Sequence, residues 1–117
     1  MSAEWIDYKT KKILYIKYKD LSPEQMLVQI KDASKMLIES NSKENLSLTD
    51  MTGCFVNDEF LDLAKKEGKT SLTYTKKAAI VGVTGIKKLL LQTVNSISPL
   101  SRKPFDDIQS AKDWLVE

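Results

Sequence analysis

The residues best suited to chemistry in this 117-residue sequence lie between Thr84 and Lys88, where an apolar, β-rich run passes into a helical pattern. A threonine and a glycine are followed there by two lysines at the start of the predicted helix. The free N–H groups of a helix N-terminus favour an anion, and cations in the first turn oppose the helix dipole unless an anion lies between them. The candidate anion-binding residues are therefore Thr84, Gly85, Lys87 and Lys88. The alternative is that Thr84 only caps the helix and both lysines are solvated.

A second candidate site follows a predicted strand that ends at Asp50. Asp50, Thr52 and Gly53 place a carboxylate and a hydroxyl in one short connection. The same residue types form ordinary turns, in which Asp50 would act as a local cap. Cys54 follows in the same loop and is either a reactive thiol or a small buried hydrophobic residue.

The composition excludes several kinds of chemistry. The chain has no histidine and one cysteine, which removes Ser-His-Asp and Cys-His catalysis, an internal disulfide and a zinc site of Cys/His type. No carboxylate is paired with a nucleophile or a metal ligand at a diagnostic spacing, and the glycine-rich phosphate and dinucleotide motifs are absent. We therefore predict a protein that is not an enzyme and that uses no metal or other cofactor.

Hydrophobic residues make up 42% and charged residues 29% of the chain, as in an ordinary globular domain. No apolar run approaches the roughly 20 residues that span a bilayer, and the first residues do not have the pattern of a signal peptide. These observations predict a cytoplasmic protein with no transmembrane segment.

The net charge of +2 conceals a basic segment, because residues 65–103 carry nine basic residues and one acidic residue. If these charges share a face they favour an anionic partner, and otherwise they form a solvated surface. Aromatic residues and lysines also mix over residues 5–19, but without an RNA-binding signature, so no nucleic-acid partner is predicted. These aromatic residues are expected to pack on the sheet or in an oligomer contact, which leaves a homodimer open.

The hydropathy pattern predicts the order β-β-α-β-α-β-α-β-α in one domain, residues 1–117. The predicted strands cover residues 5–8, 13–18, 46–50, 77–83 and 102–105. The predicted helices cover residues 23–40, 58–69, 84–97 and 108–115. Right-handed crossovers would make the later strands parallel, and the opening hairpin adds an antiparallel strand. The fold class is therefore α/β, with a mixed, mostly parallel sheet.

Three local features accompany this prediction. Ser22 and Gln25 form the pattern of a capping box, and Asp106 or Asp107 caps the last helix. Gly68 is expected to help end the second helix. The residues of the third helix that are expected to face inward are Ile86, Leu89, Leu90, Thr93, Val94 and Ile97. The inward stripe of the first helix is predicted to be Leu27, Ile30, Ala33 and Leu37.

The element order and three short segments resemble the bacterial STAS-like proteins that are related to the sporulation anti-anti-sigma factor. The segments are Leu48–Gly53, Ala79–Gly85 and Ala111–Leu115. In that family, the hydroxyl just before the glycine of the first segment is phosphorylated by a partner kinase that is also an anti-sigma factor. The resemblance implies Thr52 as the phosphoacceptor and Asp50 as the neighbouring acid, with Met51 in place of one of the family's two hydroxyl residues.

Two functional hypotheses follow. The first is a non-catalytic regulatory domain that binds a protein partner, such as a kinase, through the loop 50–57 and is switched at Thr52. The second is a domain that binds a lipid or a small anion at the turn 84–88, with an apolar cavity behind it. The second also draws on a resemblance, because the sequence is similar to a branch of the STAS-like group that has been compared with a lipid-binding fold.

Overall fold

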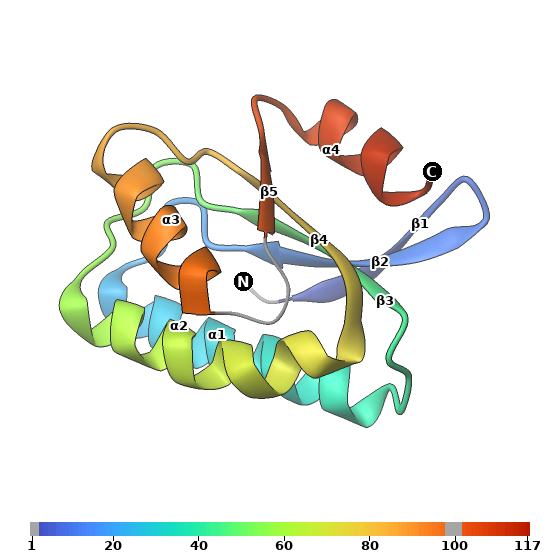
Figure 1. The fold of residues 1–117 in the computed structure, drawn as a ribbon, viewed down its shortest axis with the longest axis horizontal. Coiled ribbons are helices and arrows are strands. Elements are labelled where there is room, and N and C mark those ends of the chain that lie inside the picture. Colours follow the sequence, from blue (N-terminus) through green and yellow to red (C-terminus); the bar gives the residue numbers. More distant parts are fainter. Residues whose placement is uncertain (1–2, 98–101) are drawn as a thin grey trace.

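Apolar runs of the sequence form one sheet, and the amphipathic runs form helices on its faces (Figure 1). The computed structural model describes residues 3–97 and 102–117. The strands are β1 (Glu4–Tyr8), β2 (Lys11–Lys17), β3 (Asn45–Asp50), β4 (Thr75–Val81) and β5 (Arg102–Phe105). The helices are α1 (Pro23–Glu39), α2 (Asp58–Ser71), the 3₁₀ turn η1 (Leu72–Tyr74), α3 (Ile86–Ile97) and α4 (Ile108–Leu115). The α/β class and the mixed sheet are as predicted.

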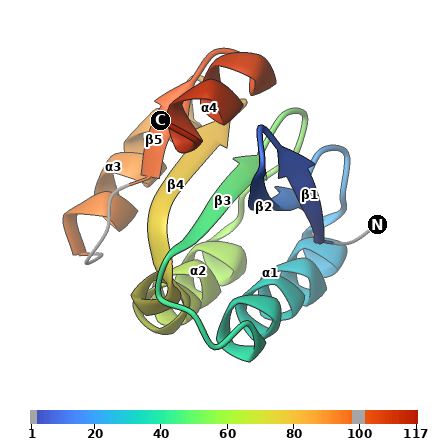
Figure 2. The same ribbon diagram turned by 90° about the vertical axis from the view of Figure 1, so that its right-hand side faces the viewer.

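The described strands lie side by side in the order in which they occur in the sequence, β1-β2-β3-β4-β5. β1 and β2 are antiparallel, whereas the pairs β2–β3, β3–β4 and β4–β5 are parallel. A helix joins each parallel pair, and right-handed crossovers that always advance in one direction put α1, α2 and α3 on one face. α4 packs on the opposite face, against β3, β4 and β5 (Figure 2).

Two apolar clusters result, one on each face of the sheet. Neighbouring residues of β2, Ile13 and Leu14, are both fully buried but enter opposite clusters, because side chains alternate along a strand. The cluster beneath α1, α2 and α3 includes Leu14, Ile16, Met26, Phe60 and Ile80. The cluster beneath α4 includes Ile13, Leu48, Ala79, Ala111 and Leu115. The central strands are therefore covered on both sides.

Two predicted helix caps are present. The Ser22 side chain accepts a hydrogen bond from the Gln25 N–H, and the Gln25 side chain accepts one from the Ser22 N–H. This reciprocal pair is a capping box and fixes the start of α1. Asp107 caps α4 by accepting a hydrogen bond of 2.7 Å from the Ser110 N–H.

The buried stripe of α1 differs in part from the prediction. Ala33 and Leu37 are buried as expected, but Met26 is fully buried while Leu27 and Ile30 are only partly buried. An apolar stripe is at least about 100° wide, so periodicity alone does not separate two adjacent rows of a helix. Packing against the sheet decides which of these rows is fully buried, and in α1 it is the row that contains Met26.

The predicted end of α2 at Gly68 is wrong. The helix continues through this glycine to Ser71 and passes into η1, so β4 begins at Thr75, in the segment expected to be a loop. Gly68 is buried, and a Cβ placed on it would lie 3.6 Å from Nη2 of Arg102. A glycine in a helix interior reduces stability by only about 1 kcal/mol relative to alanine. Gly68 therefore does not end the helix, and it lies against the Arg102 side chain.

Helix α3 begins at Ile86, two residues later than predicted, and Leu89 does not face inward. Its side chain is 62% exposed. Leu91, which is partly buried, packs instead against the cluster beneath the helices. The other predicted inward side chains lie outside the described residues, namely Ile86, Leu90, Thr93, Val94 and Ile97.

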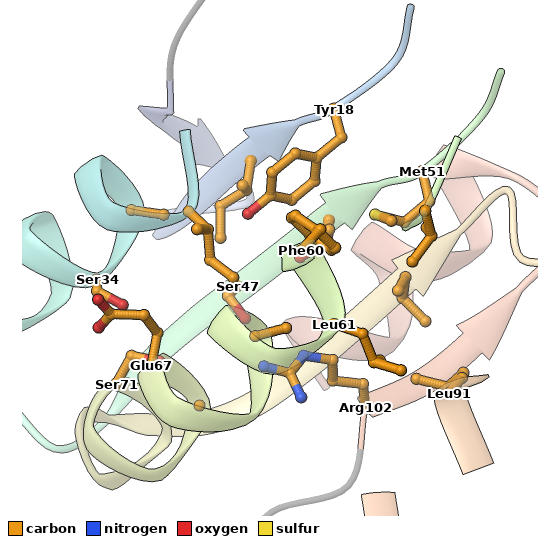
Figure 3. Close-up of a pocket in the computed structure, with 18 of the residues that line it drawn as sticks. Tyr18, Ser34, Ser47, Met51, Phe60, Leu61, Glu67, Ser71, Leu91 and Arg102 are labelled. Atoms are coloured by element: carbon orange, nitrogen blue, oxygen red, sulfur yellow. The ribbon is translucent and has the colours of Figure 1, made fainter. Parts of the chain in front are cut away.

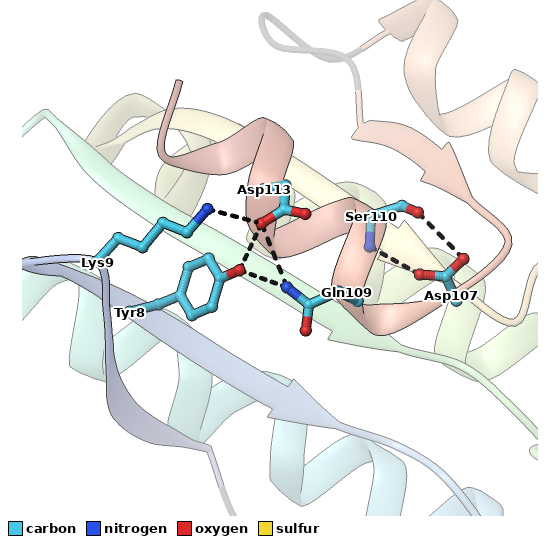
Figure 4. A network of polar contacts seen from close by, with 6 residues as sticks. All are labelled: Tyr8, Lys9, Asp107, Gln109, Ser110 and Asp113. Carbon is cyan, nitrogen blue, oxygen red and sulfur yellow. Dashed lines mark hydrogen bonds and ion pairs between the residues drawn. The ribbon is translucent and has the colours of Figure 1, made fainter.

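The hairpin β1–β2 is tied to α4 by polar contacts (Figure 4). The Tyr8 hydroxyl donates to Asp113, and Lys9 forms an ion pair of 3.3 Å with the same carboxylate. Gln109 donates to the Tyr8 hydroxyl and to Asp113. These bonds hold the pKa of the Asp113 carboxyl below its usual value, chiefly through the hydrogen bond from the Tyr8 hydroxyl. The edge hairpin and the last helix are thereby joined across the sheet.

The turn of this hairpin offers a test of local strain. Lys9 and Thr10 both have positive φ, of 48° and 69°, as a two-residue type I′ turn requires. A β-branched residue is strained there, so Thr10→Gly is expected to stabilise the protein by about 0.5–1 kcal/mol. Thr10→Val is the control, because it keeps the branched side chain and should give no gain. Thermal and urea unfolding measure both variants, and a loss of stability in Thr10→Gly would contradict the strain argument.

Candidate functional site

The loop that follows β3 is held by the buried carboxylate of Asp50. Oδ1 of Asp50 accepts a hydrogen bond of 3.0 Å from the Thr52 N–H, and Oδ2 accepts a long one of 3.5 Å from the Tyr15 hydroxyl. The N–H of Met51 donates to the carbonyl of Val81 at 2.9 Å and extends the pairing of β3 with β4. Asp50 therefore acts here as a local cap of the turn.

The two sites predicted from the sequence lie against each other. Nζ of Lys87 donates a hydrogen bond of 2.8 Å to the carbonyl of Met51, which joins the start of α3 to the loop after β3. Gly82 has a φ of +80°, and a Cβ placed on it would lie 2.4 Å from the Thr52 nitrogen and 2.5 Å from its Oγ1. The turn after β3 and the segment after β4 thus form one continuous edge of the molecule.

This edge presents a hydroxyl and a lysine to solvent. Thr52, Gly53, Thr84, Gly85 and Lys88 are exposed. The ammonium group of the half-buried Lys87 is directed to a backbone carbonyl rather than to the helix N-terminus. Two of the first N–H groups of α3 already donate to the carbonyls of Thr84 and Gly85. The turn 84–88 alone is therefore less open to an anion than its sequence suggests.

Cys54 lies beneath the same loop. It is buried, and its Sγ donates to the Met51 carbonyl at 3.1 Å. Burial raises the pKa of the thiol, and the charge of Lys87 offsets this only in part. A buried thiol with a raised pKa is a poor nucleophile, so the geometry favours the small hydrophobic residue over the reactive thiol.

Beneath the loop, a cavity of about 110 Å³ lies between the sheet and α1, α2 and α3 (Figure 3). Its walls are mainly apolar and include Ile16, Leu37, Phe60, Ile80 and Leu91. Met51 and Val56 of the loop also line it, as does the side chain of Lys87. The cavity is thus continuous with the exposed edge described above.

Polar groups enter this cavity from both the sheet and the helices. Ser47 and Thr49 of β3 are buried and line it, although the alternating sequence of this strand is typical of a solvated polar face. Figure 3 shows the hydroxyl of Tyr18 directed towards the cavity. Burial raises the pKa of this phenol, and the positive charge of Arg102 acts in the opposite direction. Tyr18 therefore remains a neutral hydrogen-bond donor at physiological pH.

Arg102 is one of the polar cavity residues that the sequence prediction missed. It was assigned only to the last strand, yet its guanidinium lines the cavity, and its Nη1 is buried without a hydrogen-bond partner. Burial lowers the pKa of this guanidinium. The backbone is fixed by Asn95 of α3, whose side chain accepts from the Arg102 N–H at 3.0 Å and donates to its carbonyl at 3.2 Å. One signal was available, because Arg102 is the only arginine in the sequence.

Comparison with protein-family models, with curated proteins and with solved structures finds no match for this chain. The resemblance to STAS-like proteins therefore stays a prediction from motifs and element order. None of the helices in the described part of the chain is both long and apolar enough to cross a bilayer. Residues 3–97 and 102–117 also contain no group of three or more side chains that could hold a metal ion.

Two glycine substitutions test the contact between the loops. Gly82 and Gly85 both have positive φ, but only the Cβ position of Gly82 meets other atoms. We expect Gly82→Ala to destabilise the protein by about 2–4 kcal/mol and Gly85→Ala by about 1–2 kcal/mol. Urea unfolding of both variants provides the comparison. Equal losses would mean that the backbone conformation alone matters and that Thr52 does not pack tightly on Gly82.

Proposed function

We propose that this protein is a non-catalytic binding protein that takes a small apolar molecule into the cavity between the sheet and its helices. The observation that carries the proposal is the cavity itself, with about 110 Å³ of space and mainly apolar walls. An apolar cavity of about 150 Å³ accommodates benzene, so a body of about six carbon atoms is the appropriate size. This proposal keeps the ligand-binding hypothesis but moves the site from the turn 84–88 into the interior.

The position of the cavity supports a role in binding. Protein interiors are close-packed, and an unfilled apolar space costs stability because its walls lose dispersion contacts. A ligand restores these contacts, so binding is favoured without any rearrangement of the sheet. Met51 and Val56 contribute to the wall from an irregular loop, and such a segment moves more readily than a strand or a helix. The loop 51–57 is the natural place for entry.

A second candidate function is regulation through a protein partner, and the exposure of Thr52 favours it. The hydroxyl belongs to an exposed residue at the carboxyl edge of the sheet, whereas the neighbouring Asp50 is buried and its carboxylate is bound by the Thr52 N–H. A phosphate on Thr52 would add nearly two negative charges to this edge and repel an acidic partner. A cognate kinase with anti-sigma activity is the partner that the STAS-like resemblance implies.

Filling the cavity tests the first proposal. Ala64→Leu adds a branched side chain to the wall and is expected to weaken the binding of benzene at least about tenfold. Ala64→Ser is the matched control, since it nearly preserves the volume and should bind within about threefold of the wild type. Titration followed by amide shifts in ¹H–¹⁵N NMR spectra reports the affinity and the place of binding. Shifts confined to the surface, or no shifts at millimolar benzene, would contradict the proposal.

Phosphorylation tests the second candidate. Incubation with a cognate kinase is expected to modify the wild type at Thr52 and to leave Thr52→Ala unmodified, as mass spectrometry would show. Thr73 is the matched control, because it is also exposed but its hydroxyl donates to the Lys69 carbonyl within η1 and the end of α2. Thr52→Glu should reduce partner binding in a pull-down assay. An unmodified Thr52, together with unchanged partner binding by Thr52→Glu, would overturn this candidate.

A further inference from the structure

The charged groups that line the cavity do not balance one another. They are Glu67, Lys87 and Arg102. The ammonium group of Lys87 donates a hydrogen bond to the carbonyl of Met51. In Figure 3 the side chain of Glu67 is directed away from Arg102, and no ion pair between the two is present. Within the described ranges the ion pair found is Lys9–Asp113. It joins the β1–β2 hairpin to α4, on the face of the sheet opposite the cavity (Figure 4).

The guanidinium of Arg102, a residue that is only partly exposed, is consequently a cation without a carboxylate. Its Nη1 has no hydrogen-bond partner. Taking a charge out of water is costly unless an opposite charge and hydrogen bonds compensate for it. Replacing the guanidinium by an apolar side chain would remove this cost, so its presence in an apolar cavity calls for an anion that is absent from the chain itself.

The surroundings of Arg102 also specify the charge of that anion. Lys87, Arg102 and Glu67 together leave one net positive charge at the cavity, and the Lys87 ammonium already donates to a carbonyl, so the guanidinium is the group left to bind a ligand. A dianion such as a phosphate monoester would remain undercompensated, whereas a carboxylate carries one charge and matches the planar fork of a guanidinium. The Tyr18 hydroxyl faces the same space and is a second donor.

We infer that the ligand is a monocarboxylic acid with a short apolar body, whose carboxylate binds the Arg102 guanidinium while its hydrocarbon part lies against Phe60, Leu37 and Ile80. This inference rests on the proposed ligand-binding function and adds the chemical class of the ligand. The apolar walls supply affinity in proportion to the buried hydrocarbon area, and the guanidinium selects acids over neutral molecules of the same shape.

The test compares hexanoate with hexanamide, which has the same length and no charge. Isothermal titration of the wild type at pH 7 is expected to show hexanoate binding at least about tenfold more tightly than hexanamide, because a charge-assisted pair is lost in the amide. Arg102→Met should bind hexanoate at least about tenfold more weakly than the wild type does, whereas its affinity for hexanamide should stay within about threefold of the wild-type value. Lys103→Met is the matched control, since Lys103 is the exposed neighbour on β5 and its loss should change neither affinity.

The outcomes separate the inference from the proposed function. If both probes bind equally well to the wild type, the carboxylate inference is overturned and ligand binding in the cavity stands. If neither probe nor benzene binds, the proposed function fails as well. Loss of both probes in a folded Arg102→Met would assign the arginine a structural role and also overturn the inference.

Stability provides an independent readout. Because Arg102→Met removes a charged group whose Nη1 is buried without a partner, the ligand-free variant is expected to melt at a higher temperature than the wild type. A lower melting temperature would show that the guanidinium is already compensated within the protein. If the variant does not fold, the side-chain Nε–Hε resonance of Arg102 in the wild type replaces it. Hexanoate should shift this resonance and hexanamide should not, and equal shifts would overturn the inference.

Discussion

Both faces of β3 and β4 are covered by helices, and the rest of the structure depends on this double burial. Right-handed crossovers place α1, α2 and α3 on one face, and α4 closes the other. Leu46 and Leu48 of β3 pack towards α4, so the alternation of the strand turns Ser47 and Thr49 towards α1 and α2. A strand with one polar side is thereby enclosed, and the helices above it do not fill the space completely.

The cavity combines apolar walls with polar groups that belong to separate elements. Tyr18 follows β2, Ser47 and Thr49 lie on β3, and Arg102 begins β5. Asn95 of α3 fixes the backbone of Arg102, so the point from which this side chain enters the cavity is set before any ligand arrives. Such preorganisation lowers the entropic cost of binding. The Nη1 of Arg102 has no hydrogen-bond partner in this arrangement, which is the kind of local cost that binding sites carry and packed cores avoid.

The exposed edge and the interior cavity are coupled through one loop. The N–H of Met51 donates to the Val81 carbonyl, and the Met51 carbonyl accepts a hydrogen bond from the Lys87 ammonium. The same residue lines the cavity. Thr52, next in sequence, packs against Gly82 and is exposed. A change at this edge therefore acts on residues that also shape the cavity wall. The two functional hypotheses concern neighbouring parts of one structural unit.

The sequence by itself determined the α/β class, the capping box of α1, the N-cap of α4 and the approximate place of every strand. These depend on local periodicity and on side-chain-to-backbone bonds. It also placed Asp50 correctly at the end of a strand. It did not determine the end of α2, the exposure of Leu89, or the place of Arg102 at the cavity. Only the tertiary structure decided these, because the neighbours that bury Gly68 and Arg102 come from strands and helices remote in sequence. Periodicity identifies an apolar face, whereas packing decides what covers it and whether a buried charge finds a partner.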